Sequence, residues 1–322
     1  MSLDQETLLD AYRRMRTIRE FEERIDTEFK AGEIPGFVHL YAGQEAVATG
    51  VCIHLRTEDY IGSTHRGHGH CIAKGCDVKG MMLEIFGRKG GLCGGKGGSM
   101  HIADLKQGML GANAIVGGSP PLAIGAALSA KTRGTDNVAI SFSGDGASNQ
   151  GTTFESMNMA VVLKLPCVFV FENNGYGEMT GVDYAVGSKD IAGRAAGFGL
   201  PSVKIDGADF FAVEAAAAEA IERARSGGVP SAIEAVVTRF YGHFIGDPQN
   251  YRAPDEVERL RAERDCLKNF RERVTSDGSL SNAQMEEIDG QVGTLIEESV
   301  NEAKAAEFPD ETELLTDVYV SY

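Results

Sequence analysis

The segment from Val138 to Tyr176 constrains the fold more than any other part of this 322-residue chain. An apolar run, Val138–Ser143, is followed by a helical pattern from Thr152 to Leu163 and by a second apolar run, Cys167–Phe171. Two short apolar runs that flank one helix, with short links between them, are typical of a β-α-β unit with parallel strands. We therefore expect an open α/β sheet with helices on both faces.

Polar side chains follow both of these predicted strands. Gly144-Asp145-Gly146 comes after the first apolar run, and Asn173-Asn174 comes after the second. Because parallel strands bring their carboxyl ends to one edge of the sheet, Asp145 and Asn174 should lie near each other. A carboxylate and an amide oxygen are ligands that Mg2+ prefers, and Mg2+ often shares its site with a bound phosphate. The spacing predicts a metal and phosphate site at this edge.

The composition argues against several classes of partner. The formal net charge of -16 disfavours nucleic acid and anionic membranes, since both need a basic surface. No apolar run reaches the roughly 18 residues that a membrane span needs. The first residues, Met1 to Glu6, lack the layout of a signal or transit peptide. The six cysteines include no Cys-x-x-Cys pair. We expect a cytoplasmic protein without a disulfide framework.

A histidine cluster allows more than one interpretation. His65, His68, His70 and Cys71 fall within seven residues, and such spacing can bind zinc. Arg66 lies inside the cluster, however, and a fixed cation repels a second one. An arginine with neighbouring imidazoles and backbone N–H groups is better suited to an anion such as phosphate. We favour the anion site, and a zinc site or a purely structural loop are the alternatives.

The segment from Gly87 to Met100 is unusually rich in glycine. Residues 90–99 nearly fit the P-loop pattern G-x4-G-K-[ST], but Gly97 stands where the Mg2+-binding hydroxyl should be. No strand-like run precedes it. We therefore reject a P-loop ATPase. A flexible lining of a cofactor entrance and close packing against another subunit remain open hypotheses.

The rest of the chain predicts helices and strands that extend this α/β pattern. We predict a doubly wound parallel sheet with added helices at both ends, forming one domain over residues 1–322, with a core of about 35–250 and helical extensions at 1–31 and 254–322. The expected helices are 3–30, 122–131, 188–197, 210–225, 255–274 and 282–306, and the further strands are 202–205 and 231–240.

The pattern of GDG and NN, with Asp145 and Asn174 29 positions apart, resembles the thiamine diphosphate motif. Longer stretches are similar to the alpha subunit of the thiamine-diphosphate-dependent first component of 2-oxo acid dehydrogenase complexes and of acetoin dehydrogenase. The similar stretches are 36–45, 65–69, 87–91, 96–101, 149–151 and 172–177, and the resemblance extends from about residue 10 to residue 250. It implies a thiamine diphosphate-binding fold, with thiamine diphosphate and Mg2+ as cofactors.

The resemblance assigns the metal and diphosphate contacts. The side chains of Asp145 and Asn174 and the backbone carbonyl of Tyr176 match the family's Mg2+ ligands. The backbone of Gly146 and Ala147 matches the part that meets the diphosphate.

The resemblance also assigns contacts around the rest of the cofactor. Arg66 matches a diphosphate-binding arginine, and His65 stands where the pyruvate enzymes usually have tyrosine. Ala114 and Val116 fall where backbone groups meet the aminopyrimidine ring.

Two histidines are the candidate catalytic residues. His243 matches a loop histidine near the diphosphate and the mouth of the active site, and His39 matches a histidine on the substrate side. Both are candidates for proton handling or for aligning an incoming lipoyl group.

The resemblance implies partners as well. A complete thiamine site in this superfamily needs two α/β domains, and this chain shows the pattern of one. We expect a beta subunit, an α2β2 heterotetramer that is active only when assembled, and a lipoyl-bearing acetyltransferase that receives the acetyl unit.

Residues 63–75 look like those of acetoin enzymes, so acetoin is the favoured substrate. Pyruvate is the second candidate and a branched-chain 2-oxo acid the third. A non-catalytic cofactor-binding or scaffolding subunit is the alternative from another class.

Overall fold

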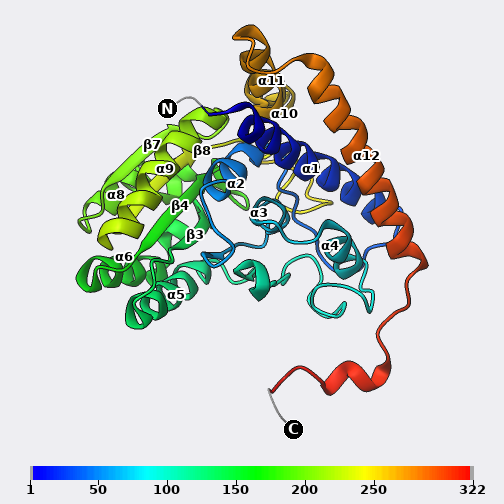
Figure 1. Cartoon of the computed structure of the whole chain (residues 1–322), viewed down its shortest axis with the longest axis horizontal. Coiled ribbons are helices and arrows are strands. Elements are labelled where there is room, and N and C mark those ends of the chain that lie inside the picture. Colours follow the sequence, from blue (N-terminus) through cyan, green and yellow to red (C-terminus); the bar gives the residue numbers. More distant parts are fainter. Residues whose placement is uncertain (1–2, 320–322) are drawn as a thin grey trace.

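The computed structural model describes residues 3–319, and its centre is an open parallel sheet with helices on both faces (Figure 1). The strand order is β2-β1-β3-β4-β8-β7, and every neighbouring pair is parallel. The predicted doubly wound α/β fold is confirmed. The strands are β1 Tyr60–Gly62, β2 Met109–Gly111, β3 Ala139–Gly144, β4 Cys167–Asn173, β7 Ser202–Asp206 and β8 Ser231–Val236.

Side chains on the central strand β4 alternate between two cores. Val168 and Val170 pack into the larger core, while Phe169 and Phe171 pack into the smaller one on the other face. This alternation follows from the two-residue period of a strand. The larger core contains α1 Gln5–Lys30, α2 Glu45–Cys52 and α9 Phe210–Gly227, and the smaller contains α5 Ser119–Arg133, α6 Gly151–Leu163 and α8 Ile191–Ala196.

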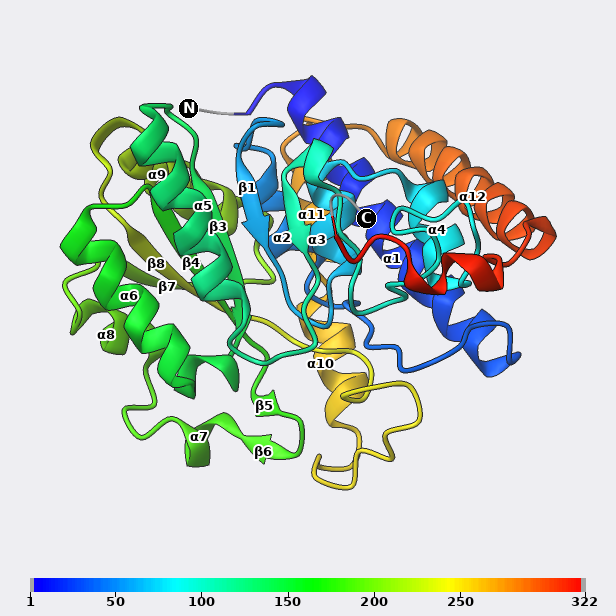
Figure 2. The ribbon, with the colours of Figure 1, turned by 90° about the horizontal axis from the view of Figure 1, so that it is seen from below.

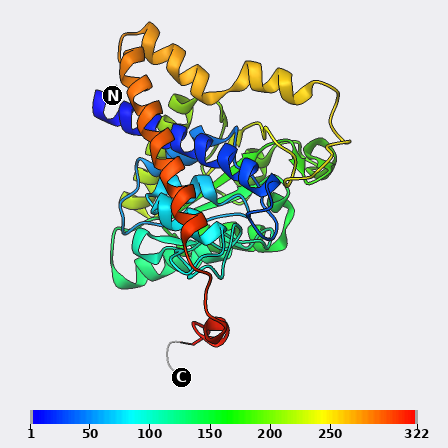
Figure 3. The same ribbon diagram turned by 90° about the vertical axis from the view of Figure 1, so that its right-hand side faces the viewer.

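The C-terminal helices pack on the N-terminal one. Helix α12, Asn282–Ala305, crosses α1 and buries its apolar side in the larger core (Figure 3). The single helix predicted over residues 255–274 is wrong, because two helices occupy this region: α10, Glu256–Arg264, and α11, Cys266–Ser276. Asp265 divides them, since its side chain caps α11 by accepting from the backbone N–H of Leu267.

Several short elements were not predicted. Strands β1 and β2 have three residues each, too few to show a period, and helices α3, His68–Lys74, and α4, Val78–Ile85, were also missed. The strand predicted over residues 231–240 ends at Val236. No helix in the described range, residues 3–319, combines the length and apolar character that crossing a membrane would require.

A small hairpin lies beyond the carboxyl ends of the central strands. It consists of β5, Tyr176–Gly177, and β6, Thr180–Gly181, followed by the short helix α7, Val182–Ala185 (Figure 2). The remaining short helices are η1 Leu105–Gln107, η2 Ala147–Asn149 and η3 Glu311–Leu315.

Candidate functional site

A cavity of about 300 Å³ opens at the carboxyl ends of β3 and β4. Most of the predicted site residues line it: His65, Arg66, Val116, Asp145, Gly146, Ala147, Asn174, Tyr176 and His243. Ala114 is not a lining residue, although its neighbours Asn113 and Ile115 are. His39 is not one either, and its ring packs against His65 and His243 with centroids 4.7 and 5.1 Å apart.

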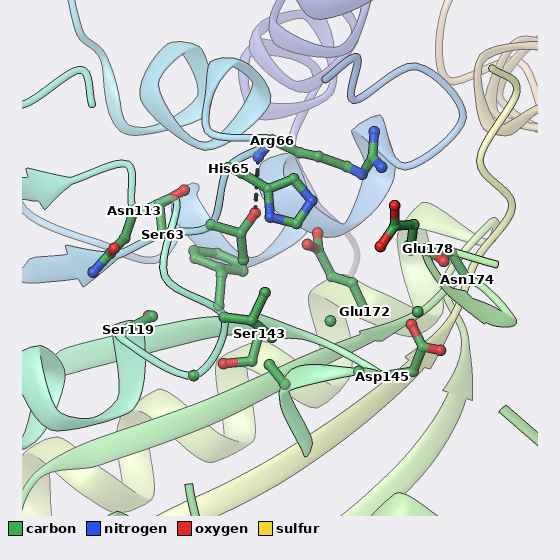
Figure 4. A pocket seen from close by; sticks show the side chains of 18 of the residues that line it. Ser63, His65, Arg66, Asn113, Ser119, Ser143, Asp145, Glu172, Asn174 and Glu178 are labelled. Carbon is green, nitrogen blue, oxygen red and sulfur yellow. Dashed lines mark hydrogen bonds between the residues drawn. The ribbon is translucent and has the colours of Figure 1, made fainter. Parts of the chain in front are cut away.

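The sheet edge brings the predicted metal ligands to one place. Gly144 pairs with Glu172 in the β3–β4 ladder, so Asp145 lies one residue and Asn174 two residues beyond this last pair. Figure 4 shows their side chains at the same end of the cavity. The Asn174 amide donates to Gln44 Oε1 at 3.3 Å. Within residues 3–319, Asp145 has no ion-pair partner, and burial raises its pKa to about 6. A buried carboxylate without a cation is suited to a divalent metal.

Two buried arginines form the cationic side of the cavity. Arg66 and Arg239 are 4% and 1% exposed, and neither pairs with a carboxylate in the described part of the chain. Arg66 donates to the carbonyls of Leu40, at 2.9 Å, and of His243. Arg239 donates to the Tyr251 hydroxyl at 2.6 Å. Burial, together with repulsion from Arg239, lowers the pKa of Arg66 to about 9.

These two guanidinium groups fit an anionic ligand. Two buried cations without counter-ions are costly, and a bound diphosphate would relieve that cost. Sequence reasoning missed Arg239, which stands three residues after strand β8. The available signal was a cation near the end of the strand-like run 231–240, in which Glu234 is the other charged residue.

Three imidazoles meet beside the arginines. One nitrogen atom from each of His39, His65 and His243 lies within 4.8 Å of the others. Burial, and then the positive charge of Arg66, lowers the pKa of His39 to about 3 and that of His243 to about 4, and it holds the pKa of His65 well below its usual value. All three are therefore neutral near pH 7. The adjacent guanidinium groups oppose a metal cation between them.

The alternative zinc site is not formed. Of the four candidate zinc ligands, helix α3 directs His68 and His70 into separate parts of the interior. His68 lies between Glu22, at 3.1 Å, and Ser99, at 2.9 Å. His70 lies between Ser63, at 2.7 Å, and Glu172, at 3.2 Å. All of these nitrogen atoms have other partners, and within residues 3–319 His65 approaches metal-ligating distance only with His39 and His243, so the zinc hypothesis is wrong.

The glycine-rich segment binds a side chain of its own chain. The buried carboxylate of Glu84, on α4, accepts four backbone N–H groups. Oε2 accepts from Cys93 and Gly95, both at 2.8 Å, and Oε1 accepts from Gly97 at 2.7 Å and Gly98 at 3.0 Å. No residue of the segment 87–100 lines the cavity described above. The segment is a largely half-exposed loop that closes on the Glu84 side chain, and the hypothesis that it lines the cofactor entrance is not supported.

Comparison with known proteins identifies the family. The family model described as "Dehydrogenase E1 component" matches residues 13–312. The chain belongs to this family. An alpha subunit of acetoin:2,6-dichlorophenolindophenol oxidoreductase from Cupriavidus necator is 59% identical over 322 residues, covering 100% of this chain and 97% of the relative. The corresponding subunit from Bacillus subtilis is 54% identical, with 100% and 96% covered.

A more distant relative belongs to the other enzyme considered above. The pyruvate dehydrogenase E1 component subunit alpha of Rhizobium meliloti is 42% identical over 310 residues, covering 96% of this chain and 89% of the relative. The predicted resemblance is therefore confirmed. Membership of this E1 family implies thiamine diphosphate as cofactor and makes the chain a component of a thiamine-diphosphate-dependent oxidoreductase.

Proposed function

We propose that this chain is the alpha subunit of a thiamine-diphosphate-dependent acetoin dehydrogenase. The enzyme cleaves acetoin into acetaldehyde and an acetyl unit, which passes to a lipoyl carrier. The observation that carries this proposal is the identity of 59% and 54%, over the whole chain, to alpha subunits of acetoin:2,6-dichlorophenolindophenol oxidoreductases. The pyruvate relative at 42% supports pyruvate dehydrogenase as the second candidate.

The cavity offers separate groups for the metal and for the diphosphate. Asp145, Asn174 and the Tyr176 carbonyl would hold Mg2+, which lowers the cost of the buried Asp145 carboxylate. Arg66 and the backbone at Gly146 and Ala147 would hold the diphosphate. The bound cofactor supplies an electron sink for breaking the bond next to the substrate carbonyl. The backbone at Ala114 and Val116 would meet its aminopyrimidine ring.

The histidines are the groups of this chain that can move protons near the substrate. A neutral imidazole both accepts a proton at one nitrogen and donates from the other. His39 and His243 are neutral near pH 7, and their rings pack against each other and against His65. We assign proton handling to His39 and His243, and contact with the diphosphate end of the cavity to His65.

The chain works as one domain of a larger assembly. The described residues contain one six-stranded sheet, and the two acetoin relatives are themselves alpha subunits. We propose that residues 1–322 form a single cofactor-binding domain, that a beta subunit supplies the second half of the thiamine site in an α2β2 heterotetramer, and that a lipoyl-bearing acetyltransferase receives the acetyl unit. We also propose that the complex acts in the cytoplasm.

Co-expression with the beta subunit tests the function. Dye reduction should require both chains and should be faster with acetoin than with pyruvate. A wide preference for pyruvate would replace acetoin by the second candidate. Asp145→Ala should abolish Mg2+-dependent thiamine diphosphate binding, measured by calorimetry, together with activity. Unchanged activity in that variant would favour a non-catalytic subunit.

A further inference from the structure

We propose that Gln44 is a positioning residue for the metal site, because its side-chain carbonyl holds the Asn174 amide in the orientation that presents Oδ1 to the metal. The inference deepens the proposed function and rests on the proposed metal site. Gln44 lines the cavity and is 1% exposed, and its Oε1 accepts from Asn174 Nδ2 at 3.3 Å. Asn174 lies with Asp145 at one end of the cavity (Figure 4).

An asparagine can bind a hard cation through only one of its two terminal atoms. Oδ1 is an acceptor and suits the metal, whereas the Nδ2 group is a donor and does not. Rotation about the last side-chain bond exchanges the two atoms, and this torsion by itself prefers neither arrangement strongly. Asp145 has no such requirement, because both of its terminal atoms are oxygens. The affinity of the metal site therefore depends on what fixes the Asn174 amide.

The orientation of the Asn174 amide follows from a donor that cannot be reversed. The backbone N–H of Tyr176 donates to Asn174 Oδ1 at 3.4 Å. Because a donor faces this side of the amide, Nδ2 lies on the other side, where Gln44 Oε1 accepts from it. Both contacts are long for N–H···O hydrogen bonds, and together they select one of the two orientations. Oδ1 then lies on the side of Tyr176, whose carbonyl is another proposed metal ligand.

Gln44 keeps its own amide in the matching orientation at a cost. Its Nε2 is buried and has no hydrogen-bond partner in the described part of the chain, residues 3–319. A buried donor without an acceptor is unfavourable, and such groups are few in native proteins. Reversing the Gln44 amide would turn a donor toward Asn174 Nδ2, which is also a donor. The requirement at Asn174 therefore explains the unpartnered Nε2, and a diphosphate oxygen is a suitable acceptor for it.

The backbone that carries Gln44 is fixed by buried groups. The preceding residue, Gly43, has φ = 100°, and an added Cβ would lie 2.2 Å from the carbonyl oxygen of Thr238. The Gly43 N–H donates to both carboxylate oxygens of Glu45, at 3.1 and 3.0 Å. Glu45 is fully buried and pairs with Arg19. A residue that orients a metal ligand needs such support, because it can hold the ligand no better than its own backbone is held.

The test compares the assembled enzyme with its Gln44→Met variant, which keeps the approximate size of the side chain and removes both amide atoms. The concentration of Mg2+ that half-saturates thiamine diphosphate binding, measured by calorimetry, should rise by roughly 10- to 100-fold. Gln44→Ala should show a rise of the same order, so a packing defect of the methionine variant cannot hide the effect. Gln5→Met changes the same residue type at an exposed position outside the cavity and should leave the Mg2+ dependence unchanged.

A double-mutant cycle with Asn174→Asp separates positioning from a general effect on the fold. An aspartate at this position presents an oxygen in either orientation, so its metal-facing atom no longer depends on Gln44. In the Asn174→Asp background, Gln44→Met should therefore raise the half-saturating Mg2+ concentration by no more than about threefold. A purely structural role of Gln44 would move this concentration equally in both backgrounds, and that result would overturn the proposal.

The outcomes distinguish this inference from the function on which it rests. A Gln44→Met enzyme with the Mg2+ dependence of the wild type would overturn the role of Gln44 and leave the metal site in place. A wild-type enzyme that binds thiamine diphosphate equally well without a divalent metal would overturn the proposed metal site, and the role of Gln44 with it. A wild type that prefers pyruvate would overturn the acetoin assignment alone.

Discussion

Two glycine-containing regions of this chain, residues 90–98 and residues 144–147, have opposite roles. Residues 90–98 direct four backbone N–H groups at the Glu84 carboxylate, whereas residues 144–147 line an open cavity. An added Cβ at Gly91 would lie 2.4 Å from Glu84 Oε2, but one at Gly144 would meet nothing within 4 Å. Glycine permits close approach to the backbone in both regions, and a neighbouring side chain decides whether a ligand can reach the backbone N–H groups.

The largest effect on stability should come from removing the buried carboxylate of Glu84. Glu84→Ala leaves four inward-pointing N–H groups without their acceptor, and should lower the free energy of unfolding by about 3–5 kcal/mol. Chemical denaturation of the isolated chain measures this. Glu84→Gln, which keeps one acceptor oxygen, should fall between this variant and the wild type. Equal stability of all three proteins would show that the loop does not depend on Glu84.

At the open cavity, removing the negative charge of Asp145 should weaken cofactor binding but stabilise the ligand-free chain. Asp145→Asn should weaken Mg2+-dependent thiamine diphosphate binding by on the order of 100-fold, because it removes the charge that balances the metal. The same variant should stabilise the ligand-free chain at pH 7 by roughly 1–3 kcal/mol. The folded-state pKa of Asp145, about 6, exceeds its unfolded value, so stability is lost as the pH rises from about 4 to 6. Calorimetry and thermal unfolding measure the two effects, and a less stable Asp145→Asn chain would contradict the burial argument.

Two glycines of the loop around Glu84 allow the cost of overpacking to be compared with the cost of backbone strain. Gly91→Ala would force its methyl group against Glu84 and should cost about 2 kcal/mol. Gly94 has φ = 69° and open space around an added Cβ, so Gly94→Ala should cost only about 1 kcal/mol. Urea unfolding compares the two. Equal costs would mean that Glu84 yields to the new methyl group.

The smallest expected effect on stability concerns His243, one of the three imidazoles beside the cavity. The folded-state pKa of His243, about 4, lies below its unfolded value of about 6.5, so the unfolded chain takes up a proton first as the pH falls between these values. Its contribution to stability is therefore lost as the pH falls through this window. When the pH is lowered from 8 to 5, the free energy of unfolding of His243→Asn should rise by about 1 kcal/mol relative to that of the wild type, after allowance for the partial exposure of His243. Stability curves of both proteins from pH 8 to pH 5 check this, and parallel curves would contradict it.

The sequence by itself determined the central β-α-β unit, the polar edge at Asp145 and Asn174, and the family. These features are local, because a two-residue or 3.6-residue period and the turn after each strand are written in consecutive residues. Parallel pairing then brings the two strand ends together without further information. The long helix over residues 3–30 was predictable for the same reason.

Only the tertiary structure decided which polar groups meet. It placed Arg239 in the cavity, left Ala114 and His39 outside its lining, and turned His68 and His70 into the interior. It also closed the glycine-rich loop on Glu84, a partner that the local sequence pattern did not predict. The direction of a side chain and the partner of a loop depend on packing between segments far apart in the chain. The sequence therefore located the cavity edge at residues 144–147, and the tertiary structure showed that the backbone N–H groups of residues 90–98 already bind Glu84.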